Sequence, residues 1–145
     1  MKAAGENIID GKKALHFTYT VPFLQSKWEV NWLGARGSVG EAGEFWVNAP
    51  DLSLLRLDVV ATDIPLELPL QQLKVTIHYR HLSSGTGQVL VPESATLTAI
   101  ERNGTLYREA MDFSHCRVFE AESNLSATSA ESEDLTKAMS RYEAE

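Results

Sequence analysis

Apolar and polar side chains alternate along most of the chain, which is the pattern of half-buried β-strands. Four runs repeat with a period of two and are separated by turn residues. Since successive side chains of a strand point to opposite faces, each run predicts a strand with one apolar face. The apolar residues of these runs are Leu15, Phe17, Tyr19 and Val21; Trp28, Val30 and Trp32; Leu55, Leu57, Val59 and Ala61; and Val75, Ile77 and Tyr79.

Shorter patterns predict further strands. Residues 44–48 form a short strand, and residues 89–101 form a longer one. The dipeptide Asn103-Gly104 is a strong hairpin signal, so residues 105–113 are expected to pair back on the preceding strand. A last strand is expected at about residues 115–122.

Two segments between these strands carry the signals of connections. Residues 34–43 contain four glycines among small and polar residues and are interpreted as a loop or a wide hairpin connection. Residues 63–70 contain two prolines and alternating leucines, so we expect an extended, partly apolar connection.

About eight strands with turns between them predict an all-β fold with minor α content. We expect an antiparallel curved sheet or half-barrel meander that occupies residues 1–127. Residues 128–145 form an acidic tail, for which a short helix and a disordered segment both remain open. The helix would begin at Ser129 or Ser132. Its apolar stripe would consist of Leu135, Ala138, Met139 and Tyr142.

Length and charge restrict the function classes. A chain of 145 residues fits one domain and can bury a core without disulfides or a structural metal. The formal net charge of −7 makes nucleic acid a poor partner, because phosphate would be repelled. Cys116 is the single cysteine, interpreted as a small apolar strand residue. No stretch approaches a membrane span, and the first residues lack the apolar core of a signal peptide. Both a cytoplasmic protein and the mature or truncated part of an exported one remain open.

No catalytic or metal-binding motif is visible. The histidines His16, His78, His81 and His115 do not follow a metal-ligand spacing, and His78 and His81 fall on opposite faces of one strand. Gly34–Gly40 matches neither a nucleophile elbow nor a phosphate loop. We therefore predict a protein that is not an enzyme, with no catalytic residue, no metal and no cofactor. A hydrolase with an unrecognised site is the least favoured alternative.

The aromatic residues are the candidate functional feature. Large aromatics on a strand face usually form core, but an apolar face with too little chain to cover it can also accept a ligand. We predict a ligand-binding apolar face made of Phe17, Tyr19, Trp28, Val30, Trp32, Phe45, Trp46 and Tyr79. The alternative is a structural module whose sheet face or edge binds a protein partner or a second copy of the chain.

Several segments resemble a group of uncharacterised bacterial cell-envelope proteins. They are Gly43–Asn48, Asp51–Leu57, Asp63–Pro65, Val89–Ala95, Phe113–Arg117 and Phe119–Ser123. The order of strands is remotely similar to the outer-membrane lipoprotein-sorting (LolA-like) carriers, in which helices close the cavity of an incomplete barrel. The resemblance implies a non-catalytic periplasmic or cell-envelope protein that binds a lipid or a lipoprotein acyl chain. The helices and first strands of that fold are absent here, so we expect the C-terminal part of a larger domain.

Overall fold

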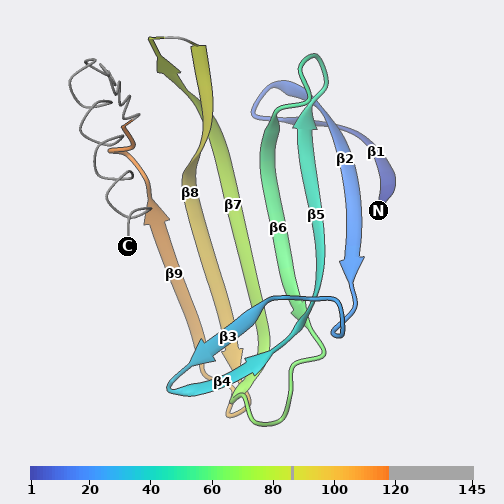
Figure 1. Cartoon of the computed structure of the whole chain (residues 1–145), viewed down its shortest axis with the longest axis vertical. Helices are drawn as coiled ribbons and strands as arrows, with labels where there is room; N and C mark the ends of the chain where they lie inside the picture. Colours follow the sequence, from blue (N-terminus) through green and yellow to red (C-terminus); the bar gives the residue numbers. More distant parts are fainter. Residues whose placement is uncertain (86, 118–145) are drawn as a thin grey trace, which may run out of the picture.

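The structure, a computed structural model, describes residues 1–85 and 87–117. This part of the chain contains nine β-strands and no helix (Figure 1). The strands are β1 (Lys2–Ile9), β2 (Lys12–Val21), β3 (Glu29–Trp32), β4 (Ala35–Ser38), β5 (Gly40–Asn48), β6 (Leu54–Thr62), β7 (Leu70–Ser84), β8 (Gly87–Glu101) and β9 (Leu106–Asp112). The predicted tail helix and most of the predicted last strand lie outside the described residues.

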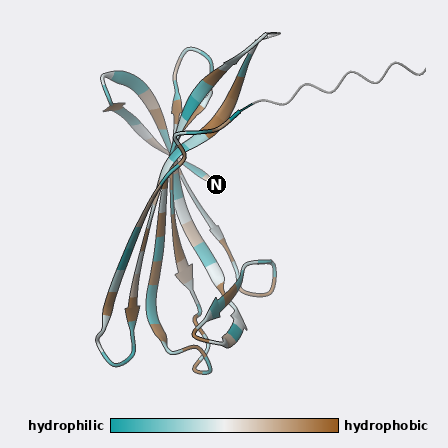
Figure 2. Ribbon diagram, turned by 90° about the vertical axis from the view of Figure 1, so that its left-hand side faces the viewer, coloured by the Kyte–Doolittle hydropathy of each residue, from teal (hydrophilic) through white to brown (hydrophobic). Residues whose placement is uncertain are grey.

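Seven strands form one antiparallel sheet in the order β1-β2-β5-β6-β7-β8-β9, and β3 pairs only with β4. Apart from the inserted hairpin, neighbours in the sheet are neighbours along the chain, which is a meander. β1 and β9 stand at the two ends of this order and do not pair with each other, so the sheet is not closed into a barrel. Seen from the β9 edge, the sheet is strongly twisted (Figure 2). The predicted all-β, antiparallel fold is confirmed.

Tight turns join the hairpins because they contain residues with positive φ. Asp10 and Gly11 have φ of 49° and 75°, and Leu33 and Gly34 have 49° and 84°. Two consecutive residues of this kind form the turn that matches the twist of paired strands. The predicted turn between β8 and β9 is also present, where the Gly104 amide (φ 89°) donates to the Glu101 carbonyl oxygen at 2.9 Å.

The interpretation of residues 34–43 as a loop or a wide hairpin connection was wrong for most of the segment, because it contains β4 and the start of β5. Its glycines allow close packing of strands. A Cβ atom on Gly37 would lie 2.9 Å from the Pro65 ring, and one on Gly40 would lie 2.5 Å from the Thr62 hydroxyl. The sheet also contains a strand that was not expected, β1, whose side chains are almost all exposed and therefore show no alternation.

The register of the sheet divides its side chains into two faces. Residues that pair across an antiparallel ladder share a face. One transverse row consists of seven apolar residues, one from each strand: Ala3, Phe17, Phe45, Leu57, Ile77, Ala95 and Met111. We call the side that carries this row the apolar face. The adjoining row on the other side contains His16, Trp46, Arg56, His78, Ser94 and Asp112, and we call that side the polar face.

The hairpin β3–β4 and residues 63–69 cover one end of the apolar face. Ala61, Leu73 and Ala99 from the sheet are buried there against Val30 and Leu68. Figure 1 shows β3 and β4 crossing the lower end of the sheet, while no other described element crosses the middle. The closed end is therefore the core, and the rest of the apolar face lacks a second layer in the described part of the chain.

Candidate functional site

Among the elements of residues 1–85 and 87–117, none covers the middle of the apolar face. Phe17, Phe45, Leu57 and Ile77 are only half-buried, although they occupy central strands of the sheet. Met111 at the β9 edge is 40% exposed. These side chains shield one another laterally, but a layer above them would remove further apolar surface from water. Burial of that surface would stabilise the protein by about 25 cal/mol per Å².

Three of the predicted site residues meet on this face. The Phe17 and Phe45 rings stack with centroids 5.2 Å apart, and the Tyr19 ring is tilted against Phe45 at 6.3 Å. Tyr19 lies over Gly43, where a Cβ atom would fall 2.4 Å from the Tyr19 ring. The missing side chain of Gly43 thus makes room for the phenol. Burial, and next a hydrogen bond to Glu41, raise the pKa of Tyr19 well above its usual value, so the phenol stays neutral.

Three further predicted residues, Trp28, Val30 and Trp32, belong to the closed end. Val30 is buried, and Trp28 and Trp32 pack against the same core. The Trp32 Nε1 group donates to Glu101 Oε1 at 2.9 Å, and the Trp32 ring meets Tyr107 edge-on with centroids 5.4 Å apart. Trp32 therefore holds the hairpin against β8 and β9.

Trp46 does not lie on the apolar face, which corrects the prediction for this residue. It pairs with His16 and points to the polar face, where the two rings stack at 4.5 Å with 4° between their planes. The guanidinium of Arg56 lies 5.0 Å from the Trp46 ring centroid. Trp46 is only 7% exposed, and its Nε1 group has no hydrogen-bond partner in the described part of the chain.

A buried carboxylate lies beside this stack on the polar face. Asp58 is 3% exposed and accepts two hydrogen bonds from Arg56, at 2.8 and 2.7 Å. Lys74 Nζ lies 3.1 Å from the same carboxylate. Burial by itself would raise the pKa of Asp58, but the hydrogen bonds from Arg56 and Lys74 outweigh it and the pKa is lowered. The group is fully paired, so we interpret it as structural.

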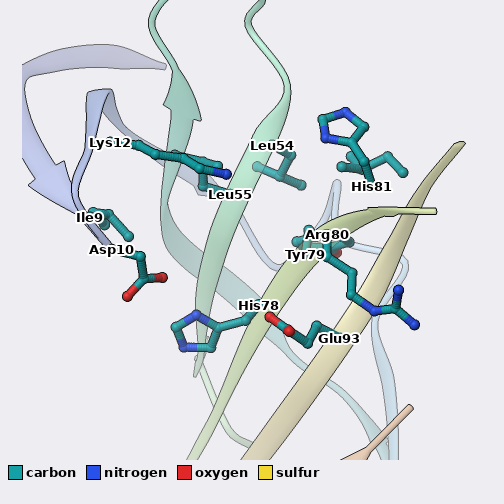
Figure 3. A pocket seen from close by; sticks show the side chains of 11 residues that line it. Ile9, Asp10, Lys12, Leu54, Leu55, His78, Tyr79, Arg80, His81 and Glu93 are labelled. Atoms are coloured by element: carbon teal, nitrogen blue, oxygen red, sulfur yellow. The ribbon is translucent and has the colours of Figure 1, made fainter. Parts of the chain in front are cut away.

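The remaining predicted residue, Tyr79, lines a cleft at the other end of the sheet. β6 pairs with β7 only from Arg56 to Val60, and above that point the two strands separate. The resulting cleft has a volume of about 510 Å³. One wall comes from the β1–β2 turn and the start of β6, and the other from β7 and β8 (Figure 3). It is lined by Ile9, Asp10, Lys12, Leu54, Leu55, His78, Tyr79, Arg80, His81, Leu90 and Glu93.

The cleft contains charged groups that the sequence analysis did not identify. Asp10 and Lys12 lie on one wall, and Arg80 and Glu93 lie on the other (Figure 3). The Asp10-Gly11 dipeptide is a recognised hairpin signal and could have revealed the first of these walls. His78 and His81 both line the cleft, although their spacing on β7 gives them opposite directions. Side chains from both faces of β7 can line the cleft because it lies between two separated strands and does not lie on one face of the sheet.

The described residues contain no group of three or more His, Cys, Asp or Glu side chains that could hold a metal ion. Of the histidines, His16 contacts a carboxylate, with its Nε2 atom 2.9 Å from Glu44 Oε2. A helix with the length and apolarity needed to cross a membrane does not occur in residues 1–85 and 87–117.

In comparisons with known proteins, no family model, no curated protein and no solved structure matches this chain.

Proposed function

We propose that this protein is a non-catalytic binder of an apolar ligand, a lipid or the acyl chain of a lipoprotein, which lies on the apolar face. The observation that carries the proposal is the row of seven apolar residues across an open sheet whose only described cover lies at one end. A flexible acyl chain can follow such a row because it needs no polar contact along its length.

Uptake of a fluorescent fatty acyl probe by the full chain tests this proposal. Each methylene that leaves water gains about 0.8 kcal/mol, so affinity should rise by up to roughly fourfold for each added CH₂ group. A folded protein that takes up no probe, or one whose affinity is independent of chain length, would contradict the proposal.

Paired variants locate the binding surface. Leu57→Asp places a charge in the middle of the apolar face and should abolish uptake. Met111→Asp places a charge at the β9 edge of the apolar face, where the side chain is 40% exposed, and should weaken uptake. The matched control is Thr96→Asp, which places the same charge on the polar face of β8 and should leave uptake unchanged. Equal effects of Met111→Asp and Thr96→Asp would place the ligand elsewhere.

A second candidate function is a protein-interaction module that uses the edge strand β9. All seven residues of β9 are exposed, and Leu106 and Tyr107 are 65% and 41% exposed. In the part of the chain that the structure describes, no strand pairs with the outer side of β9, and an edge of this kind can pair with another strand. Light scattering tests self-association: a mass that rises with concentration and falls in Leu106→Lys supports the edge, and a constant monomer mass removes the homo-oligomer.

The resemblance to cell-envelope proteins extends the proposal to location. A carrier of acyl chains works between membranes, where its ligands would otherwise be insoluble. We therefore propose that the protein works in the periplasm or at the cell envelope. Fractionation of the native cells with an antibody against the chain tests this placement, and recovery only with cytoplasmic markers would contradict it.

A further inference from the structure

The cleft between β6 and β7 lies in the plane of the sheet. Four consecutive residues of β7, 78–81, line it, together with Leu54 and Leu55 of β6. Since consecutive side chains of a strand point to opposite faces, a cavity on either face would meet only alternate residues of β7. The cleft therefore occupies the position that a further strand would take between β6 and β7 (Figure 3).

One wall of this cleft is a strand edge. The ladder between β6 and β7 ends at the pair of Arg56 and His78, and residues 79–83 of β7 pair only with β8 in the part of the chain that the structure describes. In an antiparallel sheet, the backbone N–H and C=O groups of successive residues point alternately to the two neighbouring strands. Alternate residues of this segment thus direct both groups into the cleft, where a further strand could bond to them.

The polar face of the cleft carries an excess of positive charge. By the alternation of β2 and β7, Lys12 and Arg80 lie on this face, one on each wall, and neither makes an ion pair within residues 1–85 and 87–117. Of the two carboxylates that line the cleft, Asp10 interacts electrostatically with Arg56, which leaves Glu93 against the two cations. Carboxylates on this side of an inserted strand would complement the excess charge.

The other side of an inserted strand would meet apolar groups. The extra residue of the bulge between β7 and β8 is on β8, so β7 keeps its alternation and Tyr79 points to the apolar face like Ile77. Leu90 pairs with His81 on the same face and is 37% exposed. An inserted strand would therefore carry apolar side chains at the positions between its carboxylates.

The described strands of this chain do not offer such a segment. β1 and β9, the edge strands that a second copy could contribute, have no carboxylates at alternate positions. The described chain ends beyond β9, where the Phe113 amide donates to the Glu93 carbonyl oxygen of β8. β7 and β8 thus stand between that end and the cleft. These observations favour a segment from another protein.

We propose that this cleft binds an extended polypeptide segment of another protein, in which apolar residues alternate with Asp or Glu. The segment adds a strand between β6 and β7, and its backbone bonds to the edge formed by residues 79–83. Its apolar side chains lie beside Tyr79, and its carboxylates lie beside Lys12 and Arg80. Binding in the cleft does not depend on the ligand proposed for the apolar face.

Peptide binding to the full chain tests the proposal. The probe is a fluorescein-labelled peptide that alternates valine and glutamate, and its anisotropy reports binding. Exchange of glutamate for lysine should weaken binding about tenfold, because Lys12 and Arg80 then meet like charges. A peptide of the same composition, with all valines before all glutamates, should also bind more weakly. Equal binding of these peptides, or no binding of the first one by the folded chain, would overturn the proposal.

Backbone pairing is tested separately from charge. Two N-methylated versions of the valine–glutamate peptide block the N–H groups of one or the other set of alternate residues. At least one version should bind about tenfold more weakly, the factor that two lost hydrogen bonds supply. The peptide should also protect amides of residues 79–83 from hydrogen exchange and leave those of β9 unchanged. Binding that neither methylation weakens, or protection of β9 instead, would overturn the proposal.

Variants locate the charge contact and identify the occupant. Arg80→Glu should reduce the preference for the glutamate peptide over the lysine peptide at least tenfold. The matched control is Arg108→Glu on the polar face of β9, which should leave the preference unchanged. A preference that survives Arg80→Glu would overturn the proposal.

Two results would assign the cleft to a different occupant. Residues 119–122 of this chain also alternate apolar and acidic side chains. Tighter peptide binding after Glu120→Lys and Glu122→Lys would show that this segment competes for the cleft. A mass in light scattering that falls from dimer to monomer as the peptide binds would show that a second copy occupies it. Either result would overturn the assignment to another protein.

Discussion

Replacement of Asp58 by Asn tests how the polar face holds the sheet together. The change keeps the side-chain volume but removes the charge that Arg56 and Lys74 contact. Removing one partner of a buried ion pair typically costs about 3 to 5 kcal/mol. Arg56 and Lys74 are 32% and 41% exposed and can partly rehydrate, so we expect a smaller loss, about 2 kcal/mol. A domain of this size should then melt roughly 6 to 8 °C lower.

The effect of this substitution should depend on pH. Hydrogen bonds lower the pKa of Asp58 below its ordinary value of 3.8, so near that pH the folded state binds fewer protons than the unfolded state. The stabilisation by the carboxylate is therefore complete above about pH 5 and decreases as the pH falls through the pKa of the folded state. The difference in melting temperature between the wild type and Asp58→Asn should shrink as the pH falls from about 6 to about 2.

Thermal unfolding followed by tryptophan fluorescence measures this difference. The matched control is Asp112→Asn, because Asp112 lies on the same face but is exposed at the end of β9. It should change the melting temperature little at any pH. A difference in melting temperature between Asp58→Asn and the wild type that stays constant from neutral to acidic pH would refute the reasoning. Equal melting temperatures of the variant and the wild type at neutral pH would refute it as well.

Three other predictions concern single side chains. Trp32→Phe removes one of the donors to Glu101, which is 5% exposed, and should lower the melting temperature by about 3 to 6 °C. In an absorbance titration, Tyr19→Phe should remove a phenol that ionises above the ordinary tyrosine pKa of 10.0, since burial and Glu41 raise the pKa of Tyr19; loss of a phenol that ionises at or below that pH would contradict this. Gly104→Ala forces a side chain into a φ of 89° and should reduce the free energy of unfolding in urea by about 1 kcal/mol.

Alternation predicted the strands of the sheet because most of them have one buried and one exposed face. It could not decide the face of Trp46, because Phe45 and Trp46 are adjacent and both apolar. A strand with either of the two residues on its apolar face fits the pattern equally well. The register with β2 decides it, because Trp46 pairs with His16. The strand β1 was missed for the opposite reason: an exposed edge strand has no burial to impose a pattern.

The candidate site could be predicted only in part. Phe17, Tyr19 and Phe45 meet as expected, since they occupy facing positions on neighbouring strands. The cleft could not be predicted, because it depends on where the pairing of β6 with β7 stops. Nothing in the alternation of β7 changes at His78, where its partner changes from two strands to one. The charges of the cleft therefore looked like ordinary solvated residues.

The short ladder between β6 and β7 also has a mechanical consequence. Five residue pairs join these strands, against fourteen between β7 and β8. The sheet can thus be divided into two panels, β1-β2-β5-β6 and β7-β8-β9, which are joined along this short seam. Rotation of one panel about the seam changes the separation of the two cleft walls without breaking the ladders inside either panel. We expect the amides of the seam to exchange with deuterium sooner than those in the middle of the β7–β8 ladder.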